Sequence, residues 1–354
     1  MSLKSIYLDN NATTPIAPEV IEVMSQIMTE TFGNPSSLHG AGRDAKVAME
    51  NARETCADIL GAEPFEIIFC GGGTEADNIC LKGVARALRH KREKIIVTPI
   101  EHSAIRQSAK ELSDEGFDVQ NVEVTKEGIV TPEALAELVD ENTSLVSIMY
   151  ANNEIGVVQD IPALVKIAHA RGALFHTDAV QAFGKIPVAV DELDVDLLSI
   201  SAHKIYGPKG VGLVYAKGGV KIAPLIHGGT HEKGRRPGTE NVAGIVGLAK
   251  AMELAAARAA EEYKHYTQLS ERFLGSLRGK IQDITLNGPE LSADRITRTP
   301  STVNLSFAGA EGEAIILSLD LEGIAVSSGS ACSSGATDPS PVLLAIGQTP
   351  ELAK

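Results

Sequence analysis

Residues 197–210 read Leu-Leu-Ser-Ile-Ser-Ala-His-Lys-Ile-Tyr-Gly-Pro-Lys-Gly, an apolar run that ends in polar side chains. The run predicts a buried strand, and the Gly-Pro pair predicts the end of whatever follows it. Ser201, His203 and Lys204 stand at the exit of this strand. Most lysines at strand ends are solvated. A lysine held in a pocket can instead lose its proton and attack a carbonyl carbon to form a Schiff base, so Lys204 by itself leaves both interpretations open.

Short apolar runs alternate with longer amphipathic segments on both sides of this strand. Strands are predicted at 66–70, 94–98, 118–122, 145–150, 173–177, 196–200 and 211–215. Strands that alternate with helices predict the α/β class, with a mainly parallel sheet covered by helices on both faces. Ligands of such sheets bind beyond the carboxyl ends of the strands, which is where Lys204 is expected.

The last third of the chain has a different pattern. An alanine-rich segment at 242–278 predicts a long helix with a break near Ala259. Shorter strands and one helix are predicted at 281–286, 301–307, 312–321 and 324–326. We therefore expect a large domain over residues 13–258 and a smaller α/β domain formed by residues 1–12 together with 259–354.

Composition excludes several classes of protein. A net charge of −14 over 354 residues argues against a general nucleic-acid binder, which needs clustered lysine and arginine. No uncharged apolar run approaches the length of a membrane span, and the N-terminus lacks a basic-then-apolar leader. The four cysteines show neither a CxxC pair nor zinc-ligand spacing. We expect a cytoplasmic protein with free thiols, no resident metal ion and no membrane attachment.

A glycine-rich turn follows the predicted strand at 66–70. Gly71, Gly72 and Gly73 let the backbone approach an anion, and the amides of the next helix together with the Thr74 hydroxyl can bind a phosphate. The turn lacks the ending of a nucleotide P-loop and is not a GxGxxG motif. A plain tight turn, with Thr74 capping the helix, is the alternative.

Two other polar side chains follow predicted strands. A lone histidine such as His102 is more often structural, and the functional alternative is a ring that stacks on a planar cofactor and moves protons. Asp178 is costly to bury as an anion unless a cation meets it; it otherwise caps the next helix. The phosphate turn, His102, Asp178 and Lys204 together supply what pyridoxal 5′-phosphate needs, so this cofactor is expected.

Two loops complete the set of candidates. Residues 235–241 form a polar loop before the long helix, where Thr239 either caps that helix or offers its hydroxyl to a phosphate. Residues 327–336 are rich in serine and glycine and carry Cys332. Because such a run has little to bury, it is expected to be mobile, and its cysteine could travel between a cofactor and an outside partner. The alternative is a linker with an incidental thiol.

These residues match a known family. The chain resembles cysteine desulfurases of the kind that serves iron–sulfur cluster assembly, which are fold-type I pyridoxal-phosphate enzymes of aminotransferase class V. The resemblance covers nearly the whole chain. Its most specific parts are SAHK at 201–204, HTDAVQ at 176–181, GTEADN at 73–78, RPGTEN at 236–241 and SSGSACSSG at 327–335.

The resemblance implies a role for each candidate at the cofactor. Lys204 would form the Schiff base, His102 would stack on the ring, Asp178 would pair with the ring nitrogen and Gln181 would touch the phenolic oxygen. Asn153 would contact cofactor or substrate. The phosphate would be held by Gly73, Thr74, Ser201 and His203, with Thr239 reaching in from the second subunit of a dimer.

The same resemblance implies a reaction. Cys332 would take the sulfur of L-cysteine as a persulfide, leaving alanine, and would pass the sulfur to an acceptor such as an iron–sulfur scaffold protein. Cys332 could also ligate an iron–sulfur cluster transiently. The chain departs from the family pattern at Pro341, where a histidine is usual, and it ends before the arginine that binds the substrate carboxylate. The alternatives are a selenocysteine lyase-like enzyme and a truncated cofactor-binding scaffold without turnover.

Overall fold

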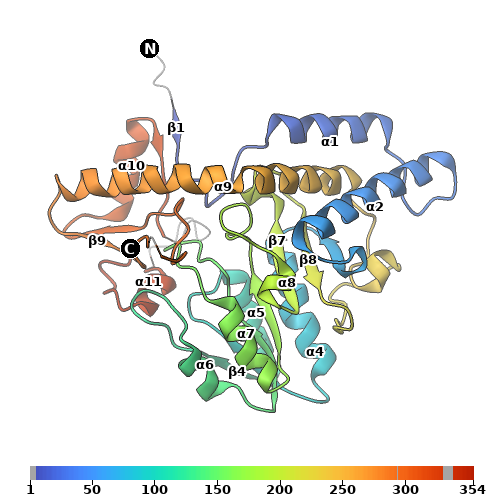
Figure 1. Ribbon diagram of the computed structural model, residues 1–354, viewed down its shortest axis with the longest axis horizontal. Helices are drawn as coiled ribbons and strands as arrows, with labels where there is room; N and C mark the ends of the chain where they lie inside the picture. The colour runs from blue at the N-terminus through green and yellow to red at the C-terminus, as the bar shows by residue number, and fades with distance from the viewer. Residues whose placement is uncertain (1–4, 293, 330–337) are drawn as a thin grey trace.

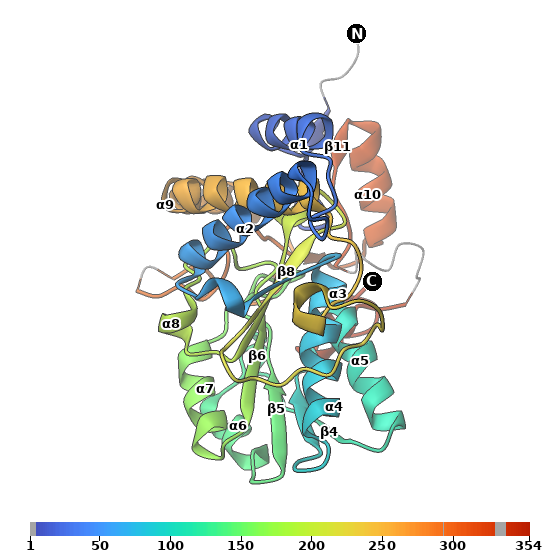
Figure 2. The ribbon, with the colours of Figure 1, turned by 90° about the vertical axis from the view of Figure 1, so that its right-hand side faces the viewer.

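The computed structural model describes residues 5–292, 294–329 and 338–354. Its centre is a seven-stranded sheet, seen almost edge-on in Figure 2. The strands lie in the order β2 (Ile67–Cys70), β8 (Gly212–Ala216), β7 (Leu197–Ser201), β6 (Leu174–Asp178), β5 (Thr143–Ser147), β3 (Lys94–Val97) and β4 (Asp118–Asn121). Strands β4, β3, β5, β6 and β7 pair in parallel, and β8 pairs antiparallel with both β7 and β2. The predicted mainly parallel α/β sheet is confirmed.

Helices cover both faces of this sheet (Figure 2). One face carries α3 (Gly73–Asn78), α4 (Val84–Leu88) and α5 (Ser103–Asp114), with a π-helical turn at Ile79–Gly83 that joins the first two. The other carries α6 (Pro132–Leu138), α7 (Ile161–Ala170) and α8 (Val190–Leu193). Strand β2 shows why both faces are apolar: Ile67 and Phe69 belong to one hydrophobic core, and Ile68 and Cys70 to the other. Alternate side chains of a strand point to opposite faces, so this strand is apolar throughout.

The longest helix, α9 (Val242–Arg278), packs against α1 (Pro18–Glu30) and α2 (Gly40–Leu60), as Figure 1 shows. It is continuous over 37 residues, so the predicted break near Ala259 is wrong. The segment around Ala259 consists almost entirely of alanine, glutamate, leucine and arginine, which are strong helix formers. The predicted division between residues 258 and 259 therefore falls inside one helix, and the two-domain division stays a prediction.

Short elements complete the fold. β1 (Ile6–Tyr7) pairs in parallel with β11 (Ile324–Ala325), and β9 (Ile284–Leu286) pairs antiparallel with β10 (Leu305–Phe307). The remaining elements are α10 (Gly312–Leu321), α11 (Pro341–Ala345) and 3₁₀ turns at Pro64–Glu66, Ala202–Lys204 and His231–Gly234. Within the described ranges, no helix combines the length and the apolar character that crossing a membrane requires.

Candidate active site

A large cavity lies where the carboxyl ends of β6 and β7 meet the N-terminal segment and the C-terminal part of the chain. Nine of the predicted site residues line it: Gly73, Thr74, His102, Asn153, Asp178, Gln181, Ser201, His203 and Lys204. Thr239 is exposed and is not among the lining residues. Cys332 lies outside the described residues. The sheet topology thus brings together side chains that are more than 100 residues apart in sequence.

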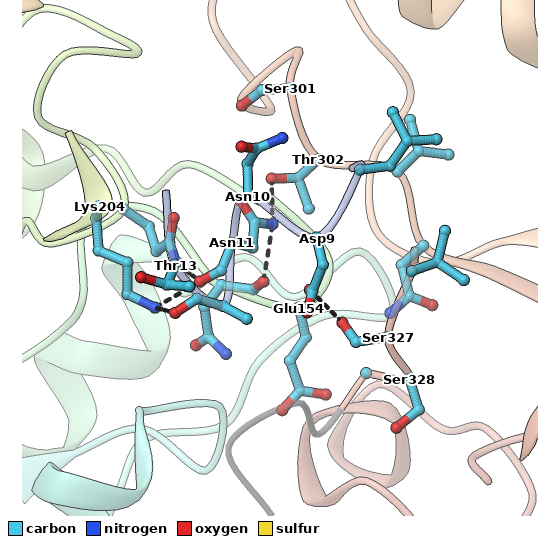
Figure 3. A pocket seen from close by; sticks show the side chains of 18 of the residues that line it. Asp9, Asn10, Asn11, Thr13, Glu154, Lys204, Ser301, Thr302, Ser327 and Ser328 are labelled. Carbon is cyan, nitrogen blue, oxygen red and sulfur yellow. Dashed lines mark hydrogen bonds between the residues drawn. The ribbon is translucent and has the colours of Figure 1, made fainter. Parts of the chain in front are cut away.

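Lys204 ends the 3₁₀ turn that follows β7, and its ammonium group faces the N-terminal segment. Its Nζ donates hydrogen bonds to the backbone oxygens of Asn11 and Ala12, the latter at 2.8 Å (Figure 3). Thr14 fixes this segment, since its Oγ1 donates to the His203 carbonyl at 3.0 Å and accepts from the Tyr206 amide at 2.8 Å. The lysine is therefore held at the cavity wall by backbone acceptors.

Asp178 is the last residue of β6 and is only 5% exposed. One carboxylate oxygen accepts a hydrogen bond from the Val180 amide at 2.8 Å. Burial raises the pKa of Asp178, and the opposing effects of His102, the Val180 amide and Lys204 do not offset it fully. A buried carboxyl group in this state favours a cation or a proton donor beside it.

His102 caps the N-terminus of α5, where its Nδ1 accepts a hydrogen bond from the Ala104 amide at 3.2 Å. Burial lowers the pKa of His102, so the ring is neutral at pH 7 with its proton on Nε2. His203 is neutral as well. Burial, assisted by Lys204 and Lys209, lowers its pKa to about 4, and its Nδ1 lies 3.2 Å from the Thr13 hydroxyl.

The glycine-rich turn has the backbone geometry that only glycine adopts easily. Gly72 has φ 138°, and a Cβ on Gly73 would lie 3.1 Å from the Val180 side chain. Close by, the Ser201 hydroxyl is buried without a hydrogen-bond partner among the residues that the structure describes. A buried hydroxyl left unpaired is destabilising, so the turn and Ser201 together form a space suited to a polar, anionic group.

Sequence reasoning missed two residues of this wall. The backbone carbonyl oxygen of Asn11 accepts hydrogen bonds from Gln181 Nε2, at 3.0 Å, and from Lys204 Nζ. Lys185 donates to Gln181 Oε1 and, at 3.3 Å, to the Asn11 side-chain oxygen. Asn11 sits in a turn that is polar like many others in this chain. The one sequence signal for a contact between Gln181 and Lys185 is their spacing of four residues. Such a spacing is common among surface residues, so it does not single out this pair.

The opposite wall is built from loops (Figure 3). Ser327 donates to the Asp9 carboxylate at 2.6 Å, and Ser340 donates to the Glu154 carboxylate at 2.5 Å. Burial raises the pKa of Glu154 to about 7, although Ser340 and Arg106 oppose the shift. These contacts hold the described chain on both sides of residues 330–337 against the cavity.

The three described cysteines are poor nucleophiles. Cys56, Cys70 and Cys80 are free and buried. Burial raises the pKa of Cys56 and Cys70 to about 12, and burial together with the nearby Asp77 raises the pKa of Cys80 well above its usual value. In the part of the chain that the structure describes, no group of three histidine, cysteine or carboxylate side chains is placed to hold a metal ion.

Pyridoxal 5′-phosphate fits these residues. Its phosphate matches the glycine turn and the unpaired Ser201 hydroxyl, and its ring nitrogen supplies the proton donor that buried Asp178 requires. Its aldehyde carbon reacts with an amine, and Lys204 supplies an amine in the same cavity as Ser201 and Asp178. His102 and Gln181 line the same cavity.

Comparisons with known proteins agree with this geometry. Residues 6–349 match the family model described as aminotransferase class-V. The chain is 51% identical over 350 residues to "Cysteine desulfurase IscS" of Dictyoglomus turgidum, covering 99% of this chain and 88% of the relative. It is 47% identical to the protein of the same name from Methanosarcina thermophila, covering 99% and 85%.

Solved structures give the same result. The chain superimposes on a "NifS-like protein" with a TM-score of 0.91 at 42% identity, covering 99% of this chain and 91% of that one. It also matches "SspA in complex with cysteine" with a TM-score of 0.84 at 34% identity, covering 99% and 96%. The chain therefore belongs to the class-V aminotransferase family of pyridoxal-phosphate-dependent enzymes and, within it, to the cysteine desulfurases.

Proposed function

We propose that this chain converts L-cysteine to L-alanine and keeps the sulfur as a persulfide on Cys332. The observation that carries the proposal is the composition of the cavity. One wall brings Lys204, Asp178 and His102 together, and the other is lined by residues 327–329 and Asp338, which flank the segment that carries Cys332. Relatives that share about half of their residues with this chain are named cysteine desulfurases.

The cavity residues would hold pyridoxal phosphate in one orientation. Gly73, Thr74, Ser201 and His203 would bind its phosphate, because they gather the backbone amides and hydroxyls that anions prefer. Asp178 would pair with the ring nitrogen, with Asn153 and Gln181 contacting the rest of the ring or the substrate. The bound cofactor supplies an electron sink that stabilises negative charge at the substrate α-carbon.

Two residues would move protons. Lys204 would hold the cofactor through its amine and would also serve as the base near the substrate α-carbon. The neutral His102 ring would take up a proton to become an imidazolium and later return it, and the nearby Asp178 carboxylate, which favours the charged ring, would stabilise that state. Its helix-capping contact fixes the ring over the cavity.

Cys332 is the favoured sulfur acceptor because the three described cysteines are buried with raised thiol pKa values. Its thiolate would attack the sulfur of bound cysteine, so that an S–S bond forms as the substrate C–S bond breaks. The substrate carbon takes the electron pair and protons and leaves as alanine. The persulfide then contains both sulfur atoms, and no external oxidant or reductant is needed until it is transferred.

The partners of this chain are inferred from its exposed surface and from Thr239, which does not line the cavity of its own chain. We propose a homodimer in which Thr239, exposed and outside the cavity of its own chain, serves the partner's cofactor phosphate. Exposed apolar side chains near α1 suit such an interface: Ile21, Met28, Phe32 and Leu38. The physiological acceptor of sulfur would be an iron–sulfur scaffold protein, in the cytoplasm, where a reducing environment keeps Cys332 free.

The proposal is tested by comparing the chain with Cys332→Ser. We expect alanine and sulfide release from L-cysteine, in the presence of a thiol reductant, to fall by more than about 100-fold in Cys332→Ser while cofactor binding is retained. Cys56→Ala, which removes a buried thiol from α2, is the matched control and should keep its activity.

Any of three results would refute the proposal. Equal rates for the chain and Cys332→Ser would show that Cys332 is a linker residue. Cofactor binding without turnover in both would leave the scaffold alternative, and turnover of selenocysteine but not cysteine would leave the lyase alternative.

A further inference from the structure

A second lysine lies in the wall that carries Lys204. Lys185 lines the cavity, and its Nζ donates hydrogen bonds to the Gln181 carboxamide oxygen and to the side-chain oxygen of Asn11. Gln181 in turn donates through Nε2 to the Asn11 backbone oxygen, which also accepts from Lys204. Lys185, Gln181, Asn11 and Lys204 therefore form one hydrogen-bonded chain.

The direction of these bonds fixes the orientation of Gln181. An ammonium group can only donate, so Lys185 binds the amide oxygen and forces the amide nitrogen to face the opposite way. That side carries the Asn11 carbonyl and Lys204. Rotating the carboxamide by 180° would place its oxygen against the Asn11 carbonyl, acceptor to acceptor, and its nitrogen against the Lys185 ammonium, donor to donor, so both partners hold it in the observed orientation.

The charges around the two lysines are also specific. Burial, with a smaller contribution from Lys204, lowers the pKa of Lys185 to about 7. Lys204 acts in turn on Asp178 at the end of β6, on His102 at the start of α5 and on its neighbour His203.

We propose that Lys185 is a positioning residue of the active site, which holds the Gln181 carboxamide in the orientation that the cofactor site requires. The inference deepens the proposed function, since it concerns the same cavity. It assigns no contact between Lys185 and substrate. A purely structural lysine would support the turn after β6 without influencing the cofactor.

The test measures the cofactor-loaded protein, with Lys166→Met, which changes an exposed lysine of α7, as the matched control. We expect Lys185→Met to weaken binding of pyridoxal phosphate about three- to ten-fold and to shift the pH midpoint of its visible absorption band. Lys185→Arg, which can still donate to Gln181, should restore most of the affinity. In the Gln181→Ala background, Lys185→Met should cost much less affinity, because the orienting contact is already lost.

Two outcomes would overturn the inference: additive losses in the double variant, or no rescue by arginine. Thermal unfolding of each variant shows whether it is folded, and a destabilised Lys185→Met is replaced by Lys185→Gln in the same measurements. If the chain binds the cofactor but does not release sulfur from cysteine, the proposed function fails while the test of Lys185 still applies.

Discussion

The two walls of the cavity are built differently. The wall at the ends of β6 and β7 places Asp178 and Ser201 at 5% and 2% exposure, anchored by the central sheet. The wall opposite consists of loops, where Ser327 is exposed and Asp9 and Glu154 are partly exposed. Strands hold side chains within a narrow range of positions, whereas loops allow larger movement.

The difference separates two tasks. Under the proposed function, the groups that would meet the cofactor in fixed geometry stand on the sheet wall. The described residues on either side of the segment that carries Cys332 stand on the loop wall, which suits the proposed transfer of sulfur from the cavity to an outside acceptor. Substitutions on the sheet wall should therefore affect the chemistry most, and substitutions on the loop wall should mainly affect stability and its pH dependence.

The largest effect is expected for Lys204→Ala on the sheet wall. Removing the amine should lower alanine formation by more than about 1,000-fold and abolish the yellow colour of lysine-linked cofactor. Absorbance spectroscopy after reconstitution and a rate assay measure the two effects. Lys221→Ala, an exposed lysine, is the control. Persistence of the yellow colour in Lys204→Ala would contradict its assignment.

A smaller loss is expected for Asp178→Asn. Asparagine keeps the shape and the acceptor for the Val180 amide but removes the charge that stabilises a protonated ring nitrogen. The rate of alanine formation should fall about 100-fold or more, while the yellow colour remains. Asp160→Asn, at the exposed start of α7, is the matched control. A variant with the full rate would show that Asp178 is only a structural carboxyl group.

The smallest effect is expected on the loop wall, at Glu154. Because its pKa is raised from 4.5 to about 7, the folded chain binds this proton more tightly than the unfolded chain does. The protonated Glu154 side chain therefore contributes fully to the free energy of unfolding below about pH 4.5, and this contribution is lost as the pH rises through about 7.

Urea unfolding at pH 5.5 and at pH 8 tests this. In the parent chain the free energy of unfolding should fall between pH 5.5 and pH 8. In Glu154→Gln, which resembles the protonated form, this decline should be smaller by about 1 to 3 kcal/mol. Glu127→Gln, an exposed glutamate of a turn, should leave the decline unchanged. An equal pH dependence in Glu154→Gln and the parent chain would show that Glu154 does not titrate in this range.

Much of this protein is determined by local sequence. The alternation of strands and helices predicted the parallel sheet, because a strand apolar on both faces needs helices on both sides. Each candidate at a strand end could be identified from its position, since parallel strands bring their carboxyl ends to one edge. The motif at 201–204 predicted that Lys204 stands at the exit of a buried strand, and the structure places it in the turn that follows β7.

Other features depended on the tertiary structure. Asn11 and Lys204 are far apart in sequence, and no local pattern shows that a backbone oxygen of one accepts from the amine of the other. The raised pKa of Glu154 and the lowered pKa of Lys185 arise from burial by distant segments. The sequence determined which chemical groups are present and which strands carry them. The packing of remote segments decided their hydrogen-bond partners and charges, because desolvation and contact depend on the whole fold.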